Sequence, residues 1–148
     1  MKLKFTPKER SHMSNLSTGS CLCGAVHFEY SGEPVFSGNC HCRDCQRSSG
    51  SAFTPALFVP EESVSIRGTV KYYESKADSG NAISRGFCPN CGSQLFAKLE
   101  IMPKMLGLRA GTLDDPSNFH PKVNIFTSSA PHWDHMNPDL PKYPKSPR

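Results

Sequence analysis

Apolar residues recur at every second position in several short segments of the chain. Val26, Phe28 and Tyr30 alternate with the polar residues His27 and Glu29, which is the period of a strand that buries one face. The same alternation, or an apolar run of strand length, is found at 64–67, 95–97, 105–108 and 123–126. The pattern therefore predicts short β-strands.

Turn-forming residues separate these segments, for example at 31–34, 79–81 and 114–116. With 13 Pro, 11 Gly and only 36% hydrophobic residues, the composition is typical of a turn-rich fold with a modest core. The one helical stretch that we expect is short, at 42–48. We predict a mainly β fold of short antiparallel strands with few or no long helices.

The length of 148 residues predicts a single domain. We place this domain at 13–143, with 1–12 as a tag or disordered leader and 144–148 as a frayed tail. No stretch approaches the ~18 apolar residues of a membrane span, and the basic N-terminus lacks the apolar run of a secretory signal. We therefore expect a cytoplasmic protein without a membrane partner.

The net charge of +4 does not indicate a nucleic-acid partner. The Lys and Arg residues are dispersed, and the densest basic stretches are the two ends, 1–10 and 142–148. Dispersed charge is the pattern of an ordinary hydrated surface, not of a phosphate-binding patch. We expect no binding of nucleic acid.

Seven cysteines carry the clearest chemical signal. An odd number cannot pair completely as disulfides, and in the reducing compartment that we expect, thiolates bind metal more often than they form bridges. Unligated buried thiols and an iron–sulfur cluster are weaker alternatives, since the cysteines are paired and the common four-cysteine runs are absent. The thiols form three clusters: Cys21 and Cys23; Cys40, Cys42 and Cys45; Cys88 and Cys91.

This spacing predicts two zinc ions held by all seven thiols. Two cysteine pairs from distant parts of the chain can close a tetrahedral structural site, and the first and third clusters fit that role. The second cluster then supplies the three ligands and vacant position of a catalytic zinc. The spacing is also compatible with a ribbon-like site of Cys42, Cys45 and the third cluster, which would leave Cys40 with the first cluster.

Titratable residues inside the second cluster are candidates for a catalytic role. His41 and Asp44 could carry a proton beside the metal or orient a ligand, or they could be exposed side chains between ligands. Arg43 and Arg47 could hold an anionic substrate, offset thiolate charge or be solvated. We predict a catalytic site made of Cys40, Cys42, Cys45, His41 and Asp44.

Other histidines and aromatic residues give weaker signals. Phe36, Phe53 and Phe58 could line a substrate pocket, although aromatic residues in β proteins more often belong to the core. Four histidines lack ligand spacing and are not expected to bind zinc: His27, which should face outward from a strand, His120, His132 and His135.

Three motifs occur in a specific order: GSCLCGAV at 19–26, CHCRDCQ at 40–46 and FCPNCGS at 87–93. GTLDDP at 111–116 follows, with weaker matches at Trp133 and at 140–141. Together these motifs resemble the glutathione-dependent formaldehyde-activating enzyme family, which includes the centromere-protein-V-like proteins. The similarity extends over 18–143, nearly the whole predicted domain.

The resemblance implies a β-tent fold built around two zinc sites. It favours a structural site made of the first and third clusters and an open, catalytic site at the second. It also implies a carbon–sulfur lyase that interconverts glutathione and formaldehyde with S-hydroxymethylglutathione. Many relatives carry His where this chain has Asn124, so any chemistry that depends on that His would be missing here.

Two other functions fit the same sequence. A non-catalytic zinc module would bind a partner protein or a small thiol, and its second metal would support no turnover. A lyase acting on a different thiol adduct would keep the mechanism and change the pocket. Turnover and substrate preference distinguish these functions from the leading one.

Overall fold

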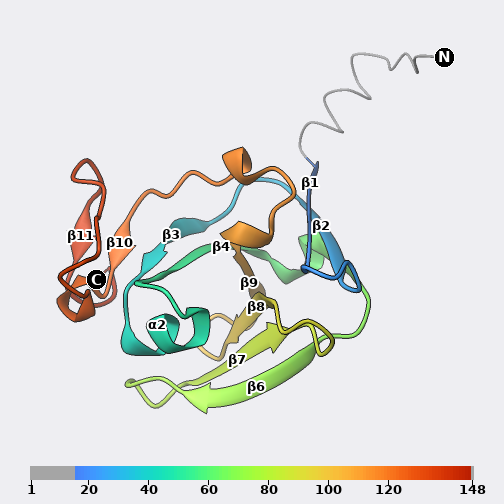
Figure 1. The fold of residues 1–148 in the computed structure, drawn as a ribbon, viewed down its shortest axis with the longest axis horizontal. Helices are drawn as coiled ribbons and strands as arrows, with labels where there is room; N and C mark the ends of the chain where they lie inside the picture. The colour runs from blue at the N-terminus through green and yellow to red at the C-terminus, as the bar shows by residue number, and fades with distance from the viewer. Residues whose placement is uncertain (1–15, 148) are drawn as a thin grey trace.

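The computed structural model describes residues 16–147, and the predicted leader at 1–12 lies outside them. The mainly β prediction is confirmed, since two sheets make up most of the fold (Figure 1). The smaller sheet is antiparallel and has the order β1-β2-β5. Its strands are β1 (Leu16–Ser20), β2 (His27–Ser31) and β5 (Val64–Arg67).

The larger sheet has the order β11-β10-β3-β4-β9-β8-β7-β6. The neighbouring strands in the series β3-β4-β9-β8-β7-β6 are antiparallel, whereas the short strand β10 is parallel to both β3 and β11. The strands are β3 (Phe36–Cys40), β4 (Thr54–Pro60), β6 (Lys71–Lys76), β7 (Ala82–Phe87), β8 (Gln94–Leu99), β9 (Met105–Arg109), β10 (Asn124–Ile125) and β11 (Lys142–Tyr143).

The helical segments are short, as predicted. The α-helix α2 (Arg43–Ser49) is close to the stretch expected at 42–48. None of the helices among residues 16–147 is long and apolar enough to cross a membrane. The four 3-10 turns are η1 (Glu61–Ser63), η2 (Ala110–Thr112), η3 (Pro116–Asn118) and η4 (Thr127–Ser129).

The segments with clear periodicity are the ones that form strands as expected. In β2, Phe28 and Tyr30 are buried while His27 and Glu29 are exposed, so the predicted outward position of His27 is confirmed. The segments at 95–97 and 105–108 lie within β8 and β9, and 64–67 is β5. Of the run at 123–126, only Asn124–Ile125 pairs as a strand.

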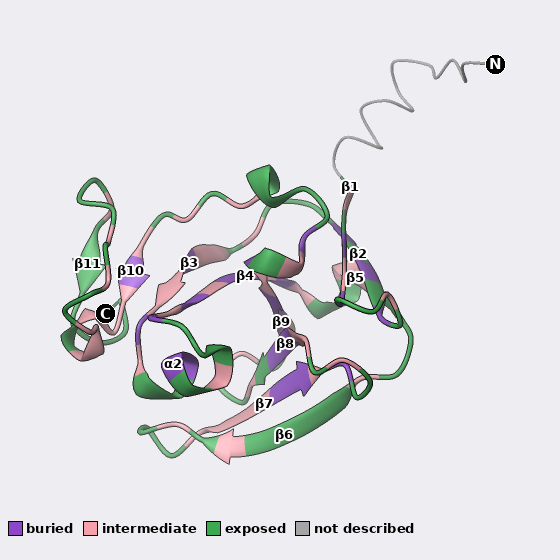
Figure 2. Ribbon diagram, viewed as in Figure 1, coloured by how far each residue is buried: buried purple, intermediate pink, exposed green. Residues whose placement is uncertain are grey.

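Two other strands lack the alternation that sequence analysis relies on. β6 is exposed along most of its length, and Figure 2 shows this edge strand almost entirely at the surface. β4 is buried or half-buried at every position because both faces of the sheet are covered there. Apolar and polar residues alternate along a strand only when one face of the strand is buried and the other is exposed to solvent, and neither β4 nor β6 has such a pair of faces.

One face of the larger sheet forms the hydrophobic core with the smaller sheet. Leu57, Leu108 and Phe96 lie directly opposite one another on β4, β9 and β8, and all three are fully buried. The Phe96 ring meets Phe28 of β2 edge to face, with 5.4 Å between ring centroids. Full burial of each such side chain contributes about 1.5–3 kcal/mol, so this contact holds the two sheets together.

The opposite face of the larger sheet carries polar chemistry. Cys40 pairs with Thr54, and Ala56 pairs with Arg109. Residues directly opposite in antiparallel strands share a face, as do residues two apart on one strand. The Cys40 thiol and the Arg109 guanidinium therefore project from the same face, the one that α2 covers.

Helix α2 is anchored at both ends. The Cys42 sulfur accepts a hydrogen bond from the Cys45 amide at 3.3 Å, and Gly50 closes the other end with φ of 70°. The side-chain Nε2 of Gln46 donates to the backbone carbonyls of His41 at 2.8 Å and Ser129 at 2.9 Å. These contacts fix the helix against the cysteine loop and the C-terminal segment.

The C-terminal segment is tied to the rest of the fold by backbone hydrogen bonds. The Asn124 and Phe126 amides donate to the carbonyls of Pro141 and Lys145, both at 2.9 Å. The Ser128 hydroxyl donates to the Pro144 carbonyl at 2.7 Å. The segment predicted to fray from 144 thus begins with two hydrogen-bonded residues.

We predict that Gly68→Ala destabilises the protein more than Gly80→Ala does. Both glycines have positive φ, 101° and 87°, so both substitutions add backbone strain. A Cβ at Gly68 would also lie 2.1 Å from the Ala25 carbonyl oxygen, whereas a Cβ at Gly80 meets nothing within 4 Å. Urea unfolding should show that Gly68→Ala lowers the free energy of unfolding by ~1–3 kcal/mol more than Gly80→Ala does. Equal losses would contradict this close backbone approach.

Candidate metal centres and the adjoining cavity

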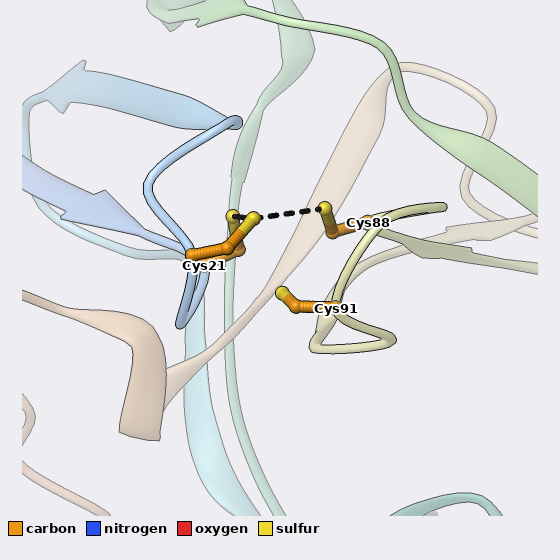
Figure 3. Close-up of side chains that lie close together, drawn as sticks. Cys21, Cys88 and Cys91 are labelled. Atoms are coloured by element: carbon orange, nitrogen blue, oxygen red, sulfur yellow. Dashed lines mark hydrogen bonds between the residues drawn. The ribbon is translucent and has the colours of Figure 1, made fainter.

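The first and third cysteine clusters meet between the two sheets. Cys21 and Cys23 lie in the turn between β1 and β2, and Cys88 and Cys91 lie between β7 and β8. The Cys23 sulfur is 3.7 Å from that of Cys21 and 3.8 Å from that of Cys88. All four sulfurs lie within 4.8 Å of one another, and Figure 3 shows the labelled side chains directed at a common centre.

Each turn presents its sulfurs through a glycine with left-handed backbone. Gly24 (φ 79°) and Gly92 (φ 78°) follow the two cysteine pairs. The Gly92 amide donates to the Cys88 carbonyl at 2.8 Å. Ser93 links the two turns, because its Oγ accepts from the Leu22 amide at 3.0 Å and lies 3.2 Å from the Cys91 sulfur. The two turns are therefore positioned relative to each other by the protein itself.

This arrangement fits a tetrahedral zinc ion. Four sulfurs at ~2.3 Å from zinc would lie about 3.8 Å apart, which agrees with the separations of 3.7 and 3.8 Å. The Ser93 hydroxyl and amide lower the pKa of Cys91 to about 5, and metal ligation requires the thiolate. The grouping is the first of the two partitions considered, and Cys42 and Cys45 do not join this cluster.

The second cluster forms a separate group of three thiols. Cys40 ends β3, Cys42 caps α2 and Cys45 lies in the first turn of that helix, with all three sulfurs within 4.8 Å of one another. Hydrogen bonds from the Cys40 and Cys42 thiols lower the pKa of Cys45, and the charge of Arg109 lowers it further. The same contacts raise the pKa of Cys40. The cluster therefore favours a thiolate at Cys45.

His41 is buried in a polar network on the C-terminal segment. Its Nε2 lies 2.9 Å from the Asn124 Oδ1, and its Nδ1 lies 2.5 Å from the Asp134 Oδ2. The latter contact is a close approach of the carboxylate to the ring that is not a regular hydrogen bond. The His41 and Asp134 side chains are 1% and 2% exposed. Both ring nitrogens are thus engaged, and Asp134 is a partner that sequence analysis did not identify.

The charged residues on α2 face solvent. Asp44 lies exposed in the first turn, where a negative charge favours the helix dipole. Arg43 is exposed and contacts Gln46, and Arg47 is exposed in the last turn. Both arginines are thus in the solvated arrangement, one of the three that sequence analysis considered.

The remaining histidines and phenylalanines considered belong to neither thiol group. Among residues 16–147, no histidine belongs to a group of potential metal ligands. The rings of Phe36 and Phe58 pack edge to face at 5.9 Å, and Phe53 packs on His41. None of these phenylalanines lines the cavity described below, and the packing on one another and on His41 is the alternative that sequence analysis also considered.

An open cavity of about 390 Å³ is lined by residues of α2, β4 and β9 and by Gly92, and none of the seven cysteines is part of its lining. Thr54, in its wall, donates its hydroxyl hydrogen to the Cys45 carbonyl at 3.2 Å. Gly92, on the opposite side, follows the last thiol of the other cluster. The lining mixes polar side chains with apolar surface and contains no aromatic or acidic residue: Ser48, Ser49, Thr54, Pro55, Gly92, Gln94, Arg109, Gly111 and Thr112.

Several proteins are similar to this chain in sequence. One from Aspergillus flavus, provisionally named a glutathione-dependent formaldehyde-activating enzyme, is 31% identical over 90 residues, or 60% of this chain and 47% of that protein. One from Halomonas elongata with the same provisional name is 26% identical over 124 residues, or 80% and 79% of the two chains. The chain spans about half the length, 47%, of the Aspergillus relatives that it matches.

The fold and the family are also matched. A crystal structure of a Rhodobacter sphaeroides protein superimposes with a TM-score of 0.54 at 18% identity, over 85% of this chain and 98% of the other. A family model described as glutathione-dependent formaldehyde-activating enzyme matches residues 16–129, a span that holds all seven cysteines. The chain therefore belongs to the glutathione-dependent formaldehyde-activating enzyme family.

Proposed function

We propose that this chain is a carbon–sulfur lyase that interconverts glutathione and formaldehyde with S-hydroxymethylglutathione. The reaction would take place at Cys40, Cys42 and Cys45. The observation that carries this proposal is the convergence of three thiols, with an open cavity whose wall includes Thr54, the residue bonded to the Cys45 carbonyl. A fourth ligand position that is not filled by protein is the usual construction of a catalytic zinc site.

The proposal assigns different roles to the two thiol groups. Cys21, Cys23, Cys88 and Cys91 would hold a structural ion, and the remaining three cysteines would hold the second ion. A zinc ion bound to the three-thiol group would supply positive charge that favours the deprotonated form of a substrate thiol. The geometry of that group would be set by the cap of α2 and by the hydrogen bond from Thr54 to the Cys45 carbonyl.

The addition is redox-neutral. The substrate sulfur forms a bond to the aldehyde carbon, the carbonyl π electrons move to oxygen, and the proton lost by the thiol returns to that oxygen. Holding thiol and aldehyde together in the cavity would account for much of the acceleration. We assign the proton return to water entering through the open cavity. Asp44, which is exposed at the start of α2 and outside the lining, would take part through such water.

His41 takes a supporting place in this proposal. It lies between two thiol ligands in sequence, and its ring is fixed by Asn124 and Asp134. Fixing this ring restrains the Cys40–Cys42 loop and so preserves the spacing of the sulfurs. With both nitrogens engaged, His41 would act by positioning the loop.

The proposed activity predicts about two zinc ions per purified chain and faster exchange between glutathione, formaldehyde and the adduct. Exchange NMR at equilibrium measures this rate against the uncatalysed background. Cys42→Ser should remove the acceleration and one zinc ion. Two ions without acceleration would refute the glutathione lyase and favour a binding module or another thiol adduct. Failure of the three-thiol group to load zinc on reconstitution would also refute it.

The two thiol groups should differ in their effect on stability. Cys88 is fully buried in the core cluster, and binding of structural zinc provides folding free energy directly. Cys88→Ser should therefore unfold the chain or lower its melting temperature strongly. Cys42→Ser should melt near the wild type, because serine can replace the sulfur as cap of α2. Calorimetry with zinc analysis tests both variants, and the reverse ranking would mean that the roles are exchanged.

A further inference from the structure

The site face of the larger sheet carries a second arginine. Arg85 on β7 pairs with Ala97, and Ala97 pairs with Gly107, two residues before Arg109. Residues that are opposite or two apart share a face. Arg85 and Arg109 thus lie on the same face as Cys40, and the positive charge of Arg85 contributes to a lowered pKa of Arg109, although burial is the main cause.

Neither guanidinium has a carboxylate partner among residues 16–147, where Asp134 contacts His41 and Glu61 pairs with Lys98. Arg85 is buried, donates to the Ser75 hydroxyl at 3.0 Å, and has an Nε without a partner. Buried cations normally have a counter-charge. Three thiolates with one Zn²⁺ carry a formal charge of about −1, so two arginines leave room for one further anion.

The cavity offers donors where that anion would bind. Arg109 lines it, and so does Gln94, whose Oε1 has no hydrogen-bond partner. No bond therefore fixes that oxygen, and the side-chain amide can turn its NH2 group toward a ligand. The hydroxyls of Thr54 and Thr112 already donate to backbone carbonyls, at 3.2 and 2.7 Å. Ser48 and Ser49 likewise donate to the carbonyls of Cys45 and Phe53, at 3.4 and 3.2 Å. Arg109 and the Gln94 amide are therefore the side chains left to donate to a ligand, and no acidic residue in the lining opposes an anion.

We propose that this cavity is a carboxylate subsite, in which Arg109 and Gln94 bind a carboxylate of the thiol substrate whose sulfur lies at Cys40, Cys42 and Cys45. The inference rests on the proposed function for the position of the sulfur. A volume of about 390 Å³ is within the range of small-molecule sites. Arginine suits the role because its planar fork matches a carboxylate. Arg109 and Gln94 would thus distinguish thiols that carry a carboxylate from thiols that do not.

The test measures binding to the zinc-loaded full chain by calorimetry. The probes are S-methylglutathione, which cannot react, and its dimethyl ester, which lacks both free carboxylates. Wild type should bind the acid ~10-fold or more tightly than the ester. Arg109→Gln should weaken binding of the acid by a similar factor and leave the ester unchanged. Arg47→Gln, an exposed arginine outside the cavity, is the matched control and should bind like wild type.

Each outcome decides the proposal. Equal affinity of wild type for acid and ester, or no binding of the acid at millimolar concentration, overturns it without any variant. Unchanged binding of the acid by Arg109→Gln also overturns the proposal. If Arg109→Gln does not fold, Gln94→Leu replaces it in the test and should likewise bind the acid more weakly. An active lyase with unchanged binding in Arg109→Gln would leave the proposed function and remove the subsite. Acid-selective binding without lyase activity would support the subsite and refute the proposed function.

Discussion

The meeting of two cysteine turns determines how the two sheets are placed. The turn that carries Cys21 and Cys23 belongs to the smaller sheet, and the turn that carries Cys88 and Cys91 belongs to the larger one. Their sulfurs come within hydrogen-bond distance, and Ser93 bonds across the junction. Because the hydrophobic core is modest, a metal at this point would supply the folding free energy that burial alone lacks.

Local patterns carried most of what the sequence could predict. The alternation around Phe28 identified β2 because this strand has one dry face and one wet face. The grouping of the first and third cysteine clusters agrees with the structure, but spacing alone left a second partition open. The resemblance favoured the grouping that forms. Exposed β6 and doubly covered β4 had no such pattern and were not identified.

The residues that sequence analysis missed are defined by long-range pairing. Asp134 meets His41 across 93 positions only because the C-terminal segment returns beside β3 through β10. Arg109 ends an apolar run and carries no motif, and its position near the thiols follows from the pairing of β9 with β4. The arginines that the sequence did single out, Arg43 and Arg47, lie at the surface. Proximity in sequence to a ligand was a poor guide to proximity in space.

The core and the site constrain each other through the same two strands. On β9, Leu108 faces the core and its neighbour Arg109 faces the thiols, and on β4 the same holds for Leu57 and Ala56. A slip of one residue would bury the Arg109 guanidinium among apolar side chains and expose Leu108. Burying the guanidinium charge without a partner costs far more free energy than exposing an apolar side chain. The packing that stabilises the fold therefore also determines which side chains reach the candidate active site.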